Sequence, residues 1–191
     1  MKFRYLAYPL LFIVFASCNR SRHSTAVVRA KTDSSYNKIQ RSGPTNPPVI
    51  ETGSVTPEQI VNFARSLKGT PYQYGSTDPK KGFDCSGFIT YVFNHFGISV
   101  PRSSKDFGSV KKEIEVNQAQ PGDLILFTGT DSTVKVPGHM GIIVARGPGQ
   151  ITFIHATSGK QYAVTETPLD SNYQKRYLKT IRVFSQNNRL H

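Results

Sequence analysis

The first strong pattern of apolar and polar positions runs over residues 56–69. Apolar side chains recur there at the spacing of one helix face. They are Ile60, Phe63, Ala64 and Leu67. Thr56 is a suitable N-cap, Pro57 suits the first helical position, and Gln59 completes a capping box. Because Gly69 ends the run, the pattern predicts an amphipathic helix over this range.

A second helix is predicted for the stretch FDCSGFITYVFNHFG, residues 83–97. Asp84 is a good N-cap, and Gly97 ends the pattern. The apolar face is broad and consists of Phe88, Ile89, Val92, Phe93 and Phe96. Cys85 therefore lies in the first turn of this helix.

The second half of the chain has the pattern of short strands separated by Gly, Pro, Asp or Ser turns. The strand segments are QPGDLILF (120–127), GHMGIIVA (138–145), QITFIHAT (150–157), YAVTET (162–167) and KTIRVF (179–184). Helices thus come first, and an antiparallel meander follows. This order predicts an α+β fold in which the helices pack on one face of a curved antiparallel sheet.

The N-terminal residues have the features of an export signal. A positively charged start precedes a short apolar run that ends at small residues, which predicts a signal peptide over 1–17. The ending FASC resembles a bacterial lipobox, in which the cysteine carries diacylglycerol, although Phe15 replaces the usual Leu. We therefore expect lipid on Cys18 and a lipid-anchored protein of the cell envelope, periplasmic or associated with the outer membrane. Ordinary secretion without lipidation is the alternative.

Between this signal and the first helix the chain is rich in Ser, Thr, Asn, Arg and Pro. It shows neither helical nor strand periodicity, so residues 18–55 are predicted to form a disordered tether. Residues 56–191 are then the ordered domain.

The formal net charge of +12 is spread thinly, with +4 over residues 19–56 and +6 over 57–191. In an exported protein, this excess suits an anionic envelope of lipid head groups or acidic wall polymers. No clustered pattern of basic and aromatic residues is present, so nucleic acid is not an expected partner.

Cysteine usage raises the question of chemistry. If Cys18 carries lipid, Cys85 has no disulfide partner, and an unpaired thiol in an oxidising compartment is either buried and inert or used for its reactivity. The first turn of a helix favours a thiolate, which suits a nucleophile. A buried structural cysteine in a Phe-rich helix is the simpler alternative.

A thiolate nucleophile needs a base, and the base needs an orienting group. Of the five histidines, His23 lies in the tether, His191 is the last residue, and His95 lies near a helix end, where we expect it to cap carbonyls. His139 and His155 lie in neighbouring predicted strands, where side chains come within about 5 Å. The arrangement predicts His139 as base and later acid, and His155 as orienting residue. Each histidine alone is better explained as a polar residue at a strand end, and only the combination with Cys85 favours catalysis.

The segments FDCSGF, PGDLILF, HMGIIVA and FIHATSG are similar, in order and spacing, to the motifs of the NlpC/P60 family of bacterial cell-wall peptidases. These are papain-like enzymes with a Cys–His–polar triad, and the resemblance covers about residues 56–184. It implies hydrolysis of peptidoglycan stem peptides, typically at the γ-D-glutamyl to diamino-acid bond, through an acyl-enzyme on Cys85 and without a cofactor. A monomer is expected, with a regulatory partner as an open question.

The resemblance also implies roles for residues around the nucleophile. Tyr72 matches the family tyrosine whose hydroxyl helps the Cys85 backbone N–H stabilise the oxyanion. Asp84 and Ser86 match the residues that hold the free amine and the D-glutamyl group of the stem. In PRSSKDF, Ser104 matches a serine that contacts the stem, whereas Phe107 stands where the family often has Gln.

The same residues allow three other interpretations. Cys85, His139 and His155 are ligand types for zinc, but no close ligand pair nucleates a site, so no metal is predicted. A non-catalytic envelope lipoprotein that binds wall peptides would not need a reactive thiol beside two imidazoles. An amidase or acyltransferase on the same fold remains open, because fold and triad do not fix the acyl acceptor.

Overall fold

The computed structural model describes residues 49–189, all within one unit of the chain, Gly43–His191. The predicted signal peptide (1–17), the predicted lipid site Cys18 and most of the predicted tether lie outside the described residues. Among the helices in the described part of the chain, none combines the length and apolar character that crossing a bilayer requires.

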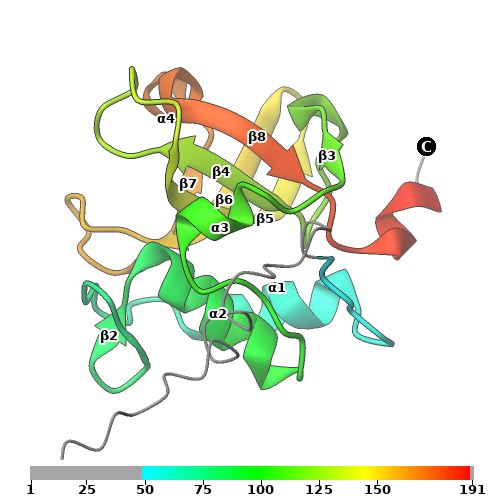
Figure 1. The fold of residues 1–191 in the computed structure, drawn as a ribbon, viewed down its shortest axis with the longest axis horizontal. Coiled ribbons are helices and arrows are strands. Elements are labelled where there is room, and N and C mark those ends of the chain that lie inside the picture. The colour runs from blue at the N-terminus through cyan, green and yellow to red at the C-terminus, as the bar shows by residue number, and fades with distance from the viewer. Residues whose placement is uncertain (1–48, 190–191) are drawn as a thin grey trace, which may run out of the picture. The chain divides into compact units, whose positions relative to one another are not determined.

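Four α-helices and eight strands make up the described chain (Figure 1). The helices are α1 (Pro57–Ser66), α2 (Cys85–His95), α3 (Ser104–Phe107) and α4 (Ser171–Arg176). The strands are β1 (Thr77–Asp78), β2 (Gly82–Phe83), β3 (Glu113–Ile114), β4 (Leu124–Thr128), β5 (Pro137–Gly147), β6 (Gln150–Ala156), β7 (Val164–Pro168) and β8 (Tyr177–Ile181). Single 3-10 helices cover Val116–Gln118 and Ser185–Arg189.

Strands β3 to β8 form one six-stranded antiparallel sheet in the order β3-β8-β4-β5-β6-β7. The run β4 to β7 is the predicted meander. β8 departs from it, because the chain returns across the sheet and pairs with the free edge of β4, where Ile181 lies opposite Leu124. The α+β fold is therefore confirmed, whereas a meander over all five predicted strands is wrong.

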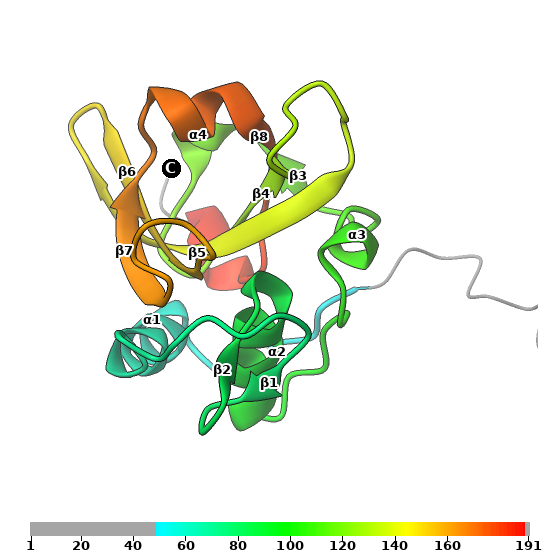
Figure 2. The same cartoon turned by 90° about the vertical axis from the view of Figure 1, so that its left-hand side faces the viewer.

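Helices α1 and α2 pack on one face of this sheet, and α4 lies on the other (Figure 2). The main core lies under α1 and α2 and includes Ile60, Phe88, Phe93, Leu126, Ile142 and Ile154. A smaller core on the opposite face consists of Ala119, Ile125, Phe127, Ile143 and Phe153. Because both faces are covered, every residue of β4 is buried, which explains its uninterrupted apolar sequence.

The predicted helix caps are confirmed. Thr56 accepts a hydrogen bond from the Gln59 backbone N–H (3.3 Å), and the Gln59 side chain accepts one from the Thr56 N–H (2.8 Å), which completes the capping box. Asp84 caps α2 by accepting from the Gly87 N–H at 2.5 Å. The two helix starts are therefore set by local sequence.

The structure departs from the sequence reading at His95 and Ile50. The imidazole of His95 stacks on the ring of Phe63, with centroids 3.8 Å apart, and does not serve as the expected carbonyl cap. Ile50, inside the segment predicted as a tether, is 6 % exposed and belongs to the main core. Packed structure therefore begins before Thr56.

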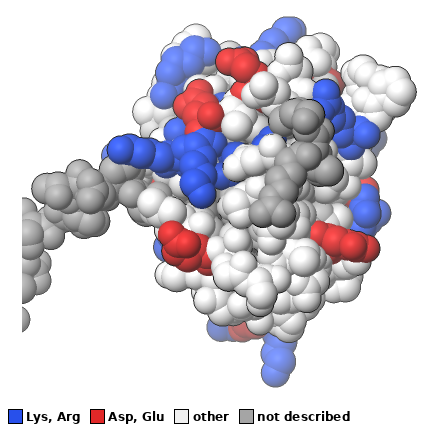
Figure 3. Space-filling model, turned by 90° about the vertical axis from the view of Figure 1, so that its right-hand side faces the viewer, with Lys and Arg blue, Asp and Glu red and all other residues white. Residues whose placement is uncertain are grey.

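Basic and acidic side chains lie scattered among uncharged ones on the face in Figure 3. This distribution agrees with the even spread of charge along the sequence.

Candidate active site

Cys85 is the first residue of α2 and lies in a cleft of about 490 Å³. All four residues expected to contact substrate line the same cleft: Tyr72, Asp84, Ser86 and Ser104. The glycine of the DCSG stretch has a steric reason, since a Cβ on Gly87 would collide with the carbonyl oxygen of Ser76. The first turn of α2 can therefore approach the preceding loop closely.

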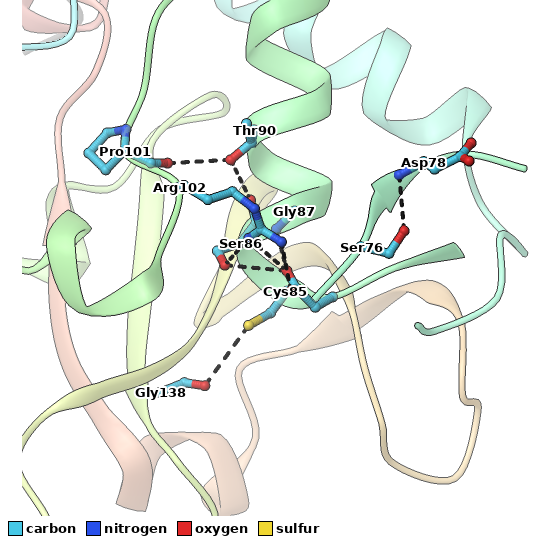
Figure 4. A network of polar contacts seen from close by, with 10 residues as sticks. Ser76, Asp78, Cys85, Ser86, Gly87, Thr90, Pro101, Arg102 and Gly138 are labelled. Atoms are coloured by element: carbon cyan, nitrogen blue, oxygen red, sulfur yellow. Dashed lines mark hydrogen bonds and ion pairs between the residues drawn. The ribbon is translucent and has the colours of Figure 1, made fainter. Parts of the chain in front are cut away.

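The Cys85 sulfur points away from α2 toward the start of β5 (Figure 4). Its thiol donates to the carbonyl oxygen of Gly138 at 3.9 Å. Burial raises the pKa of this thiol to about 11, and the negative charge of Asp84 adds to the effect. The backbone N–H groups of Ser86, Cys85 and Met140 act in the opposite direction.

The helix N-terminus therefore favours the thiolate as expected, but loss of solvent outweighs it. Burial therefore favours the neutral thiol, against the thiolate that the position in the helix favours. Burial is a tertiary property that the position of Cys85 in a helix does not reveal.

His139 on β5 and His155 on β6 form a hydrogen-bonded pair. Nε2 of His139 lies 2.7 Å from Nδ1 of His155, and the rings meet edge to face. Burial lowers the pKa of His155 to about 3, with a further contribution from Arg176. Burial, His155 and Arg176 together hold the pKa of His139 well below its usual range. Both imidazoles are therefore neutral at pH 7.

Thr167 on β7 extends the pair into a chain of three side chains, with its hydroxyl 2.9 Å from Nε2 of His155. The chain can run in two directions. When His139 donates to His155 and His155 donates to Thr167, Nδ1 of His139 is free to accept a proton. The opposite direction protonates Nδ1. Because Nε2 of His139 is occupied, Nδ1 is the nitrogen that remains for a thiol.

Thr167→Val is expected to lower kcat/KM by about 10-fold, because it removes the hydroxyl that accepts the hydrogen bond from His155. The two histidines can then adopt the opposite hydrogen-bond direction, in which Nδ1 of His139 is protonated and cannot act as a base. Thr167→Ser keeps the hydroxyl and should stay close to wild type. Steady-state rates for the three proteins test the role. Equal rates for the valine and serine variants would contradict it.

Arg102 binds both Asp84 and Ser86; Figure 4 shows Arg102 beside Ser86. The guanidinium donates to both carboxylate oxygens of Asp84, at 3.2 and 2.9 Å, and to the Ser86 hydroxyl at 3.0 Å. Asp84 Oδ1 also accepts from Gly87 and Ser86, so Oδ2 is the less occupied oxygen. Sequence reasoning missed Arg102, although it stands two residues before Ser104 in the stretch already singled out.

Tyr72 and Ser104 are distant from one another in sequence, and both line the cleft. Burial raises the pKa of the Tyr72 phenol, with Cys85 and Asp84 adding to it, so its hydroxyl stays a donor. The Ser104 hydroxyl donates to the Pro137 carbonyl at 3.2 Å and ties α3 to β5. Phe107 is fully buried in the main core and is not one of the residues that line the cleft.

Within residues 49–189, no cluster of three or more His, Cys, Asp or Glu side chains is placed to hold a metal ion. The nitrogens that face one another in the histidine pair are joined by a hydrogen bond.

The histidine pair makes stability depend on pH. In the unfolded chain His155 has a pKa near 6.5 and in the fold about 3, so the unfolded state gains protons first as pH falls. Stability is therefore full above pH 6.5 and declines toward pH 3, by about 2 kcal/mol at pH 5 from His155 alone. Denaturant unfolding at pH 7.5 and 5 measures it. His155→Asn should show a smaller decline; parallel declines would contradict the assignment.

Comparisons with known proteins agree with one another. The family model described as NlpC/P60 family matches residues 69–183. Gamma-DL-glutamyl hydrolase of Bacillus subtilis is 34 % identical over 134 residues, which are 70 % of this chain and 32 % of that protein. Probable endopeptidase NlpC of Escherichia coli is 34 % identical over 62 % of this chain and 73 % of its own.

Among solved structures, an NlpC/P60 family protein from Bacillus cereus matches with a TM-score of 0.61 and 25 % identity, over 70 % of this chain and 42 % of that one. The chain spans about a third of the length of the first curated relatives it matches.

Proposed function

The chain belongs to the NlpC/P60 family, and we propose that it is a cysteine endopeptidase that hydrolyses peptidoglycan stem peptides through an acyl-enzyme on Cys85. One observation carries the proposal: His139, which is hydrogen-bonded to His155, directly follows Gly138 on β5, whose backbone carbonyl contacts the Cys85 sulfur. We place the cut at the γ-D-glutamyl to diamino-acid bond. The name of the Bacillus subtilis relative, a gamma-DL-glutamyl hydrolase, supports that bond.

In the proposed reaction the Cys85 thiol turns from the Gly138 carbonyl and gives its proton to Nδ1 of His139. The sulfur then attacks the γ-carbonyl carbon of the D-glutamyl residue, and the carbonyl π electrons move to oxygen. The Cys85 N–H and the Tyr72 hydroxyl donate to this oxyanion. When it collapses, the C–N bond breaks, and His139 protonates the leaving amine.

Hydrolysis of the thioester completes the cycle. His139, neutral again, removes a proton from water, and the hydroxide adds to the acyl carbon. Collapse of the second tetrahedral intermediate breaks the C–S bond, and the proton returns from His139 to sulfur. The products are a peptide ending in γ-D-glutamate and a peptide with a free amine on the diamino acid.

The Cys85 thiol and the His139 imidazole are both expected to be neutral before substrate binds, which has a consequence for the rate of the reaction. With the pKa of the thiol near 11 and that of His139 low, proton transfer is unfavourable in the empty cleft. Transfer becomes favourable only when the new negative charge moves onto an oxygen held by fixed donors. An enzyme of this kind keeps a thiol that is poorly reactive toward other electrophiles until substrate is bound.

We also propose that lipid on Cys18 anchors the protein in the cell envelope, on the basis of the lipobox resemblance. The mature N-terminal peptide should then carry a diacylglycerol mass on Cys18. A Cys18→Ala variant is expected in the soluble fraction of the envelope.

Digestion of purified peptidoglycan tests the proposed activity. A protein beginning at residue 49 retains Ile50, which packs in the core, and is incubated with the wall polymer. Mass spectrometry of the released fragments should find peptides that end in γ-D-glutamate. Fragments cut at another bond would correct the bond, and a folded protein that binds the wall but releases nothing would support a non-catalytic role.

A further inference from the structure

Helix α4 covers the histidine pair on the sheet face opposite α1 and α2. The ring of Tyr173 lies against both imidazoles, with centroids 5.5 Å from His155 and 6.2 Å from His139. The same ring packs on Phe127 and Phe153 of the smaller core. Tyr173 is therefore the wall that separates the pair from solvent on this face.

Arg176 lies on the same tyrosine, with its Cζ 5.5 Å from the ring centroid. One guanidinium nitrogen, Nη2, donates to the backbone carbonyl of Thr128 at 2.9 Å. Its Nε is buried and has no hydrogen-bond partner among the described residues. A buried N–H group without a hydrogen-bond partner lowers the stability of the fold. An arginine at this position therefore suggests a function other than stability.

Arg176 is also uncompensated in charge. Within the described part of the chain it makes no ion pair, whereas Glu166, the acidic residue of neighbouring β7, is engaged by Arg65 and Lys68. The Asp170 carboxylate caps the start of α4 by accepting from the backbone N–H groups of Asn172 and Tyr173. No carboxylate among the described residues therefore forms an ion pair with Arg176, although the charge of Asp170 also acts on Tyr173.

We propose that Tyr173 and Arg176 are positioning residues for the histidine pair: Tyr173 fixes the two rings and excludes water, and Arg176, held against the Tyr173 ring and the Thr128 carbonyl, places a positive charge that opposes protonation of both imidazoles. The proposal rests on the proposed function, because it assigns the pair as base and orienting group. A base that is already neutral remains available in an acidic medium. Arg176 acts in the direction that this role needs: together with burial, its positive charge lowers the pKa of both histidines.

The groups that face the pair are few. From α4 they are Tyr173 and Arg176, and from β7 the Thr167 hydroxyl. Burial raises the pKa of Tyr173, so its phenol is neutral over the range in which the histidines could titrate. Arg176 is then the one permanent charge that acts on both imidazoles in the described structure.

The first test replaces Arg176 in the full chain by Met, which keeps the length and removes the charge, and by Lys, which keeps the charge. The exposed neighbour Lys175→Met is the matched control. Imidazole resonances followed by NMR should titrate about one pH unit higher in Arg176→Met, and near wild type in the other two. The acidic limb of kcat/KM should move upward in the same variant. Unchanged titration in a folded Arg176→Met protein would overturn the proposal.

The NMR readout separates this inference from the proposed function. If the protein hydrolysed no wall peptide but its imidazoles still responded to Arg176→Met, the positioning role would stand and the substrate would be wrong. If Arg176→Met did not fold, Arg176→Gln provides the same loss of charge with a polar group for the Thr128 carbonyl.

The second test concerns Tyr173. Tyr173→Phe keeps the ring and should retain kcat within about two-fold, whereas Tyr173→Ala should lower kcat about 10-fold or more with little change in KM, because the rings lose their wall. A purely structural residue would lower the amount of folded protein without changing kcat per folded molecule. Equal kcat for Tyr173→Ala and wild type, corrected for folded fraction, would contradict the role.

Discussion

Cys85→Ala is expected to lower kcat/KM for peptidoglycan fragments by about 10⁴-fold or more, which leaves no measurable turnover. The proposed reaction passes through a bond to sulfur, and a methyl group offers no substitute. The fold should persist, because α2 is capped by Asp84 and alanine is a good helix residue. We expect the free energy of unfolding to stay within about 1 kcal/mol of wild type.

The second cysteine provides the control. The proposed reaction gives Cys18 no role, so a soluble Cys18→Ala preparation should keep full activity. Binding of wall peptides to Cys85→Ala should also persist, since the substrate-facing groups remain. Residual activity above about 1 % of wild type in a preparation free of wild-type enzyme would contradict a nucleophilic role for Cys85.

His139→Ala is expected to reduce kcat/KM by about 10³-fold to 10⁴-fold, because the same imidazole accepts the thiol proton and protonates the leaving amine. His155→Ala should be milder, about 10-fold to 10²-fold, since His155 orients the base and does not react. Rates and circular dichroism on the purified variants measure both effects.

His95 supplies a matched control for this series. It is an exposed histidine at the C-terminal end of α2 that stacks on Phe63, and His95→Ala should change kcat/KM less than two-fold. An equal loss in His139→Ala and His155→Ala would contradict the division of roles. Unfolding of both would make them core residues and remove the assignment.

Local sequence signals predicted the elements that carry the site. The capping residues Thr56 and Asp84 set the starts of α1 and α2. The short apolar segments and the turn residues between them predicted the strands that carry His139 and His155. The return of β8 to β4 is a pairing between distant segments, which no local pattern encodes. α4 has a single half-buried aromatic, Tyr173, and therefore shows no helical repeat of apolar residues.

The sequence predicted the reactive residues of the candidate site but not the residues that hold them in place. Cys85 and the histidines have distinctive chemistry, whereas Arg102, Thr167 and Arg176 are common residue types whose roles depend on contacts across the fold. Of these, Thr167 could have been found from the alternation of side chains along a strand. Glu166 of β7 lies opposite Ile154 of β6, so the residues that follow them, Thr167 and His155, point to the same side of the sheet. The pKa of Cys85 depends on burial, which the sequence does not give.

Detection of the acyl-enzyme tests the central claim most directly. Wild-type protein is mixed with a synthetic L-alanyl-γ-D-glutamyl-diamino acid peptide, quenched with acid at short times, and analysed by mass spectrometry after proteolysis. The account predicts a transient L-alanyl-γ-D-glutamyl adduct on the peptide that contains Cys85, formed before free product and absent in Cys85→Ala. Cleavage of the peptide by wild type and by Cys85→Ala alike, with no adduct on Cys85 at any time, would contradict it.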